Sequence, residues 1–90
     1  MRRIFKYALK IEEYQQLSMQ KGAHILAVMV QDGRLYLWAD VNDAEGLCTR
    51  NFAVRGTGHP FPEIPSTTQL YVGSVIMGHF VWHVYELVRV

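Results

Sequence analysis

Cysteine is nearly absent from this sequence of 90 residues, which contains only Cys48. A single thiol leaves no partner for an internal disulfide, and the first residues, Met1–Arg3, are not followed by the apolar run that a secretory signal requires. Both absences are typical of the reducing cytoplasm. We therefore expect a cytoplasmic protein without disulfides.

An excess of charge of one sign and long apolar runs are also lacking. Nine Lys and Arg residues nearly balance eight Asp and Glu residues, which leaves a net charge of +1. Non-specific nucleic-acid binding relies on many cationic side chains along one face, so this balance excludes a simple electrostatic case for it. No apolar run reaches the roughly 18–20 residues that a membrane-spanning helix requires. We expect neither non-specific nucleic acid nor a membrane as a partner.

The length and the hydrophobic content of 50% indicate one globular domain over residues 1–90. A chain of this size buries only about 60–65% of the surface that its unfolded form exposes. Self-association is a natural way to bury more. We therefore expect a homo-oligomer.

Short segments rich in β-branched and aromatic residues dominate the chain, and no segment has the apolar period and the caps of a helix. In the first segment Phe5, Tyr7 and Leu9 share one parity, as in a half-buried strand. The expected strands are residues 3–11, a short strand around Leu17 and Met19 after a polar connection at 12–16, and then 23–30, 35–41, 48–55, 70–77 and 80–88. Six to seven short strands predict an all-β fold, a small antiparallel sandwich or partly open barrel.

Two hairpins are predicted from their turn residues. Asp32-Gly33 separates two apolar segments, and this pair readily adopts the positive φ values of a tight hairpin turn. Gly78-His79 joins the last two segments in the same way. Because segments 70–77 and 80–88 are apolar on both faces, we expect them to be central strands or to be buried against a partner subunit.

The longest irregular stretch begins at Gly56–Pro62 and runs to about Thr68. Three prolines deny it helical structure, and loops of this length in compact domains are often functional. Its first residues, Arg55, Gly56, Thr57, Gly58 and His59, predict an anion site, because consecutive backbone N–H groups in a glycine-rich turn form a concavity that Arg55 supplements with a directional cation. The alternative is a structural turn in which His59 bonds the backbone.

Tyr36 and Trp38 share the parity of segment 35–41 that faces away from the apolar residues. This spacing allows a flat base to stack on them while Arg50 or Arg55 reaches its phosphate. Aromatic residues on strands also serve as core or as a subunit interface, and that alternative stays open.

Metal and catalytic motifs are sparse. On a strand, His79 and His83 lie about 13 Å apart, too far to share one metal ion. No Cys-x-x-Cys or His-Glu-x-x-His motif is present, so we expect no metal and no cofactor. For catalysis, His59 is a candidate acid or base. The candidate nucleophiles are Thr57, Ser74 and Cys48, none with a motif-level partner, so a binding role ranks above an enzyme.

Four motifs in order resemble a family of short, uncharacterised proteins encoded by bacteriophages and prophages. They are Arg3–Tyr7, Gly22–Leu26, Leu37–Ala39 and Gly56–Pro60, and the resemblance runs nearly from end to end. It carries no established activity and no catalytic residues. It implies a setting, which is a small accessory protein in the cytoplasm of an infected bacterium, where such proteins often bind host factors or sequester the nucleotide signals of host defence.

Three hypotheses follow. The first is a homo-oligomeric protein that sequesters a small anionic, nucleotide-derived ligand without catalysis, with phosphate at Arg55 and Gly56–Gly58, a hydrogen bond from His59, and the base on Tyr36 or Trp38. The second is a protein interaction module, whose apolar strands at 23–30 and 70–88 cover a host protein or a second subunit. The third is a small phosphohydrolase that uses His59 as acid or base.

Overall fold

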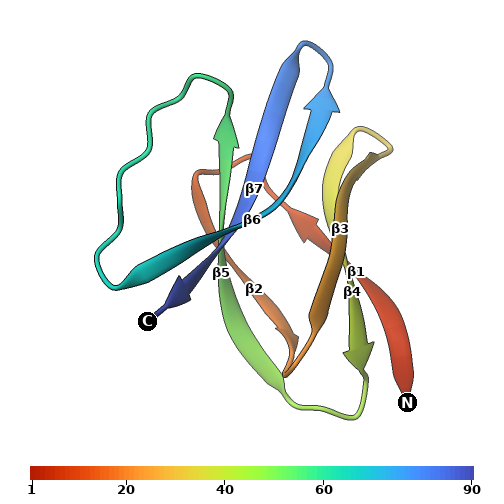
Figure 1. The fold of residues 1–90 in the computed structure, drawn as a ribbon. Coiled ribbons are helices and arrows are strands. Elements are labelled where there is room, and N and C mark those ends of the chain that lie inside the picture. The colour runs from red at the N-terminus through yellow and green to blue at the C-terminus, as the bar shows by residue number, and fades with distance from the viewer.

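Seven β-strands and their connections make up the whole chain in the computed structural model, which describes all residues 1–90 (Figure 1). The strands are β1 (Arg2–Leu9), β2 (Tyr14–Gln20), β3 (His24–Gln31), β4 (Arg34–Asn42), β5 (Leu47–Gly56), β6 (Thr67–Met77) and β7 (Phe80–Arg89). There is no helix, and hence none that is long and apolar enough to cross a membrane. The predicted all-β class is confirmed.

The strands form two antiparallel sheets, one of three strands in the order β1-β4-β3 and one of four in the order β2-β5-β7-β6. Neither sheet closes into a barrel. All seven strands contribute to one hydrophobic core, in which Leu37, Phe52 and Val84 are completely buried. The open, two-sheet arrangement agrees with the predicted sandwich or partly open barrel.

Strand β4 shows why the pattern predicts the fold well. Leu35, Leu37, Ala39 and Val41 are at most 2% exposed, because alternate side chains of a strand point to one face. At the turn before β4, Asp32 has φ 52° and Gly33 has φ 74°. These positive values match the right-handed twist of the two strands, so the Asp-Gly hairpin is confirmed.

Strand β1 ends at Leu9 rather than at residue 11. Two further boundaries, the starts of β2 and β6, also differ from the prediction. Strand β2 begins at Tyr14, within the stretch expected to be a connection, because Tyr14–Gln16 pairs with residues 51–53 of β5. Strand β6 begins at Thr67 rather than at Leu70, which leaves residues 57–66 as the loop. Backbone pairing places polar residues in a strand in both cases, so side-chain pattern alone places these boundaries wrongly.

The predicted last hairpin is confirmed: β6 pairs with β7, and Gly78 in the turn between them has φ 60°. Strand β7 is central, between β5 and β6, whereas β6 is an edge strand. The edge position accounts for exposed apolar side chains such as Ile76, which is 72% exposed.

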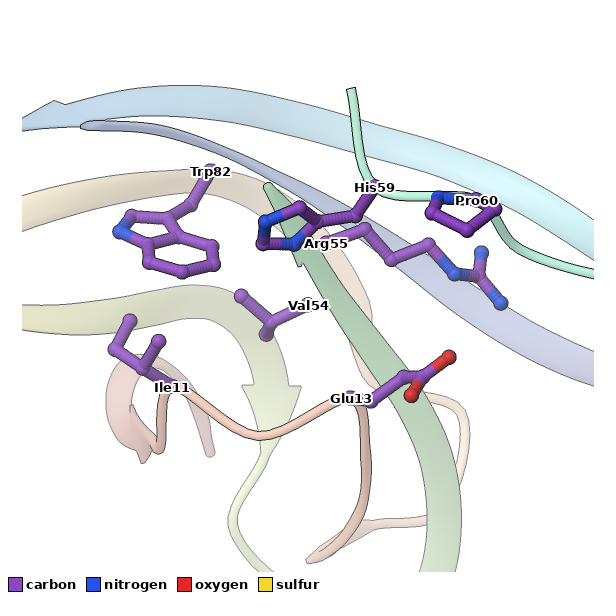
Figure 2. Close-up of a pocket in the computed structure, with 7 residues that line it drawn as sticks. All are labelled: Ile11, Glu13, Val54, Arg55, His59, Pro60 and Trp82. Atoms are coloured by element: carbon purple, nitrogen blue, oxygen red, sulfur yellow. The ribbon is translucent and has the colours of Figure 1, made fainter. Parts of the chain in front are cut away.

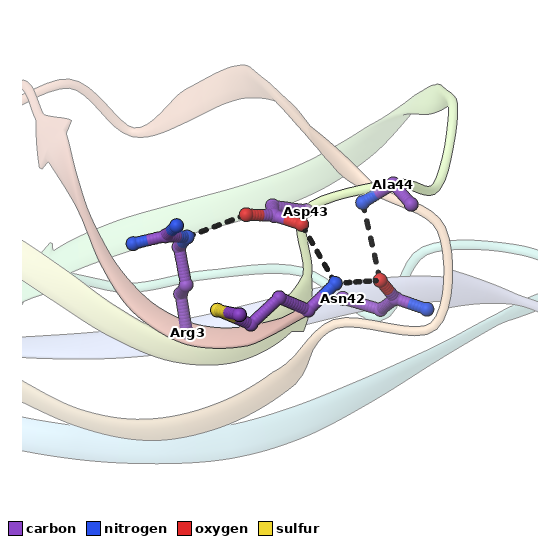
Figure 3. A network of polar contacts seen from close by, with 5 residues as sticks. Arg3, Asn42, Asp43 and Ala44 are labelled. Atoms are coloured by element: carbon purple, nitrogen blue, oxygen red, sulfur yellow. Dashed lines mark hydrogen bonds and ion pairs between the residues drawn. The ribbon is translucent and has the colours of Figure 1, made fainter.

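The N-terminal strand is clamped to the end of β4 by ion pairs. Asp43 accepts hydrogen bonds from Arg3 and from the N-terminal ammonium of Met1 (Figure 3). The neighbouring Asn42 side chain accepts a hydrogen bond from the backbone N–H of Ala44, which shapes the turn after the strand. Both ion pairs of Asp43, with Arg3 and with the N-terminal ammonium, lie at the surface, where such pairs contribute little to stability.

The 57–66 loop leaves β5 and returns at β6 (Figure 1). Along β5 the inward residues are Phe52 and Val54, so Ala53 and Arg55 point outward. Both outward residues are nevertheless buried. Arg55 lies against the loop residue Phe61, whose ring centre is 4.0 Å from Arg55 Cζ and 5.8 Å from the ring centre of Tyr85 on β7.

Candidate functional site

Arg55 is the one polar or charged residue that is buried in this fold, with 3% of its surface exposed. Its Nη1 donates a hydrogen bond to Gln69 Oε1 at 2.6 Å. Nε and Nη2, which form the other edge of the guanidinium, have no hydrogen-bond partner and no contact with solvent. A buried N–H without a partner costs about 1–3 kcal/mol, and more when the group is charged. A ligand that offers a hydrogen-bond acceptor to Nε and Nη2 would therefore remove a substantial energetic cost.

Three aromatic rings lie around this guanidinium. The Arg55 carbon Cζ lies 4.0 Å from the ring centre of Phe61, 5.4 Å from that of Tyr85 and 5.8 Å from that of Tyr14. Such contacts attract a cation through the negative face of the ring. They leave the Nε and Nη2 donors without a hydrogen-bond acceptor.

Gln69 fixes the orientation of the guanidinium. Its amide nitrogen donates to the carbonyl of Pro62 at 3.1 Å, so its oxygen is held toward Arg55 Nη1. The same two hydrogen bonds connect β6, the 57–66 loop and β5. Arg55 is therefore held in one orientation, which favours selective recognition over adaptable contact.

A cavity of about 370 Å³ lies beside Arg55, at the edge of β5 beyond the point where β2 stops pairing with it. This volume lies within the range of about 300–1,000 Å³ that is typical of small-molecule sites. Figure 2 shows that the cavity has two ends. The apolar end is formed by Ile11, Val54 and Trp82, and the polar end by Glu13 and Arg55, with His59 and Pro60 above.

Glu13 is the acidic residue of this cavity, and it makes no ion pair with Arg55. Its carboxylate points toward the side of the cavity that holds the guanidinium (Figure 2). Its backbone carbonyl accepts a hydrogen bond from Val54 N at 3.2 Å, which fastens the β1–β2 connection to β5. The main chain of Glu13 is thus fixed, whereas its exposed side chain is free to move.

The glycine-rich residues of the loop use most of their backbone donors within the chain. Thr57 N donates to the carbonyl of Val81 at 3.2 Å, and His59 N donates to that of Gly56 at 3.1 Å. Gly58, with φ 84°, keeps its N–H free of any partner in the chain. Within Gly56–Gly58, the segment predicted to cradle an anion, the N–H of Thr57 is therefore already used and that of Gly58 is available.

His59 lies against Gly56 and the indole of Trp82. A Cβ atom added at Gly56 would lie 2.8 Å from His59 Cε1 and 3.2 Å from Trp82 Cζ3, so only glycine permits this approach. The His59 and Trp82 rings meet edge to face, with their centres 6.2 Å apart. The imidazole is thus part of the cavity wall.

The remaining predicted residues lie elsewhere. Tyr36 and Trp38 form an edge-to-face pair, 5.8 Å between ring centres, on the outward face of the three-stranded sheet. Lys6 Nζ lies 4.5 Å above the Tyr36 ring. Arg50 points inward and binds Glu86 through Nε and Nη2. The structure therefore brings Arg55, Gly56 and His59 together, and places the Tyr36–Trp38 pair in the other sheet.

Several residues of the site carried no sequence signal. The aromatic residues around the guanidinium come from β2, the loop and β7, and Trp82 comes from β7 as well. The register of β5 with β7 makes Tyr85 and His83 neighbours of Arg55 on the outer face, so this part follows once the register is known. The contacts of Phe61 depend on the path of the loop, which no local pattern specifies.

A second polar cluster lies on the same outer face. His83 Nε2 is 2.7 Å from Thr57 Oγ1, and His83 Nδ1 is 2.7 Å from Ser74 Oγ. Ser74 Oγ is in turn 2.6 Å from Tyr71 Oη. The imidazole that contacts the predicted nucleophiles Thr57 and Ser74 is therefore that of His83, not that of His59. No group of three or more His, Cys, Asp or Glu residues is arranged to hold a metal ion.

Comparison with known proteins identifies one family. A family model described as a domain of unknown function, DUF7352, matches residues 1–90. No curated protein and no solved structure matches the chain. Because the match extends over the complete sequence, the chain belongs to the DUF7352 family.

Proposed function

We propose that this protein sequesters a small anionic, nucleotide-derived ligand at Arg55 and leaves that ligand chemically unchanged. The observation that carries the proposal is the buried guanidinium whose Nε and Nη2 have no partner, beside a cavity of about 370 Å³. A fold retains such a group against its cost when the group serves a purpose other than stability.

The two free donors of Arg55, Nε–H and Nη2–H, determine the chemical class of the ligand. Nε–H and Nη2–H of arginine are parallel donors, spaced to bind two oxygens of a phosphate or carboxylate at once. This chain contains an example, because Arg50 uses the same edge to bind both oxygens of Glu86, at 2.6 and 2.7 Å. An oxyanion bound to Arg55 in that way lies in the plane of the guanidinium.

The apolar end of the cavity suits the rest of a nucleotide. Trp82 offers a ring on which a flat base stacks, with Ile11 and Val54 beside it. This wall takes the role that the sequence suggested for Tyr36 and Trp38.

Entry of the ligand requires a local movement. Because Nε and Nη2 have no contact with solvent, an oxyanion reaches them only when the cover shifts. The cover includes Phe61, which is itself 46% exposed, and residues 59–62 of the loop make few backbone hydrogen bonds. Segments of this kind open at low free-energy cost. The resemblance to phage proteins supports a setting in which the captured ligand is a signal of host defence.

Isothermal titration calorimetry against a panel of linear and cyclic nucleotides tests the proposal. We expect a stoichiometric complex with at least one of them, and a loss of about 2–5 kcal/mol in binding free energy for Arg55→Lys, which keeps the charge but removes the paired donors. Lys21→Arg, at an exposed turn, is the matched control and leaves the affinity unchanged. Absence of binding to any nucleotide, or full affinity in Arg55→Lys, contradicts the proposal.

A protein interaction module is the second candidate, supported by the β6–β7 hairpin. Ile76 and Phe80 near its turn are 72% and 65% exposed, and β6 leaves one backbone edge unpaired. Exposed apolar residues beside an open edge are typical of strand-addition surfaces, in homo-oligomers as well as with host proteins. Native mass spectrometry of the purified protein, with Phe80→Asp as the variant, distinguishes the two candidates: dissociation of a complex by the variant supports this one.

A further inference from the structure

The structure assigns a second role to the outer face of the four-stranded sheet: we propose that Thr57 and His83 form a nucleophile–base pair that accepts acyl groups from activated carboxylic esters. The inference is independent of ligand binding at Arg55. It rests on the contacts that connect Thr57, His83, Ser74 and Tyr71 in one chain of hydrogen bonds.

The first contact provides the activation. Thr57 Oγ1 lies 2.7 Å from His83 Nε2, within the range in which an imidazole removes the proton of an attacking hydroxyl. Thr57 is exposed and is the first residue after β5, so an ester can approach it from solvent. Ser74 is exposed as well, but its Oγ lies within hydrogen-bond distance of both His83 Nδ1 and Tyr71 Oη, whereas Thr57 Oγ1 contacts only His83.

The other contacts orient the base. When Thr57 donates to Nε2, the proton of the neutral imidazole is on Nδ1 and is donated to Ser74 Oγ at 2.7 Å. The Ser74 hydroxyl then donates to Tyr71 Oη at 2.6 Å. Thr57, His83 and Ser74 thus each donate a hydrogen bond to the next residue in the chain, and all three side chains are able to act as donors. Ser74 and Tyr71 are therefore positioning residues: they orient the ring, and in this direction of the chain Nε2 accepts the proton of Thr57.

A donor for the developing oxyanion is also close. Gly58 follows Thr57 directly, and its backbone N–H has no partner within the chain. A backbone N–H next to the nucleophile is a common stabiliser of the tetrahedral intermediate in acyl transfer. With φ 84°, the position suits glycine and leaves the side from which substrate approaches free of a side chain.

Thr57 Oγ1 bonds to the acyl carbon and its proton moves to His83 Nε2, while the carbonyl electrons move onto oxygen. Collapse of the intermediate breaks the bond to the leaving alcohol, which takes the proton from Nε2. Water then attacks the acyl-threonine by the same route, which releases the acid and restores the hydroxyl. No carboxylate supports the imidazolium, so the pair is limited to esters with good leaving groups.

Acetylation by p-nitrophenyl acetate tests the inference. Intact mass and peptide mapping are expected to locate one acetyl group on Thr57. His83→Gln is expected to slow acetylation of Thr57 by about 100-fold or more, because a general base contributes at least this factor. His79→Gln, which changes an exposed histidine in the β6–β7 turn, is the matched control and leaves the rate unchanged.

The inference is overturned if the acetyl groups are found only on amines or on Ser74, or if His83→Gln reacts at the wild-type rate. Should His83→Gln fail to fold, as judged by the loss of dispersed amide signals, Ser74→Ala replaces it. This variant keeps the imidazole but removes the acceptor of Nδ1–H, and a several-fold slower acetylation of Thr57 is expected. An unchanged rate in a folded Ser74→Ala also overturns the assignment. Calorimetry with nucleotides is unaffected by either result, so this inference and the binding proposal fail separately.

Discussion

Arg50 and Arg55, five residues apart on β5, point to opposite faces of the same sheet and use the same guanidinium edge in opposite ways. Arg50 donates through Nε and Nη2 to Glu86 and through Nη1 to the carbonyl of Ala23. The hydrogen bonds to Glu86 raise the pKa of Arg50. Arg55 donates only through Nη1, to Gln69, and its Nε and Nη2 have no partner. One arginine serves the fold, and the other is available for a ligand.

This difference predicts opposite effects of the same substitution. Arg55→Met removes a buried and incompletely bonded cation, so we expect the free energy of unfolding to stay unchanged or to rise by up to about 3 kcal/mol. Arg50→Met leaves the carboxylate of Glu86 without its partner and is expected to lower it by about 2–3 kcal/mol. Urea denaturation of both variants measures the effect. A large destabilisation by Arg55→Met would show that its role is structural.

Gly56→Ala is expected to damage the cavity. The added Cβ meets the His59 ring at 2.8 Å and the Trp82 ring at 3.2 Å, so His59 must move away. We expect a loss of about 1–3 kcal/mol in stability and weaker nucleotide binding. Gly46→Ala is the matched control, because a Cβ there meets nothing within 4 Å. Thermal unfolding and calorimetry of both variants measure this, and equal behaviour of the two would contradict the described packing.

Glu13→Gln is expected to tighten the binding of anionic ligands. The carboxylate lines the same cavity as Arg55 and repels a phosphate there, and the amide keeps its size and its hydrogen-bonding capacity. The gain is expected to be several-fold and to decrease at high salt. Glu45→Gln, in the turn between β4 and β5, is the control and has no effect. Weaker binding by Glu13→Gln would mean that the carboxylate contacts the ligand directly.

The clamp at the N-terminus predicts a dependence on acid. The N-terminal ammonium and then Arg3 lower the pKa of Asp43 below its ordinary value of 3.8. Because the folded-state pKa lies below the unfolded one, the stabilisation is complete above the unfolded value and is lost as pH falls through the folded value. Asp43→Asn is therefore expected to have a lower urea midpoint than the wild type near neutral pH, and the difference is expected to shrink as the pH falls below 3.8. A constant difference between the two proteins would exclude this linkage.

The sequence predicts most of the fold because its strongest signals are local. Alternation on β4 and the Asp32-Gly33 pair place a buried face and a tight turn without any knowledge of distant residues. Strand β2 was predicted too short because its first residues are polar and are held by pairing with β5. The register between strands is a long-range property, and side-chain pattern does not determine it.

The candidate site was predictable only in part for the same reason. Arg55 and the glycines stood out by composition, and the structure places Arg55, Gly56 and His59 around one cavity. The aromatic cover of the guanidinium and the contacts of His83 depend on how the loop crosses the sheet. The pairing of Thr57 with His83 joins residues 26 positions apart, which no sequence spacing reveals.

The most direct test of the binding site is the side-chain Nε–H signal of Arg55 in a ¹H–¹⁵N NMR spectrum, recorded with and without saturating nucleotide. Arg50 is the internal reference, because its Nε–H already donates to Glu86. We expect the Arg55 signal to move toward the position of the Arg50 signal when ligand binds, while the Arg50 signal stays in place. A nucleotide that binds without moving the Arg55 signal would contradict the assignment of this guanidinium edge as the anion site.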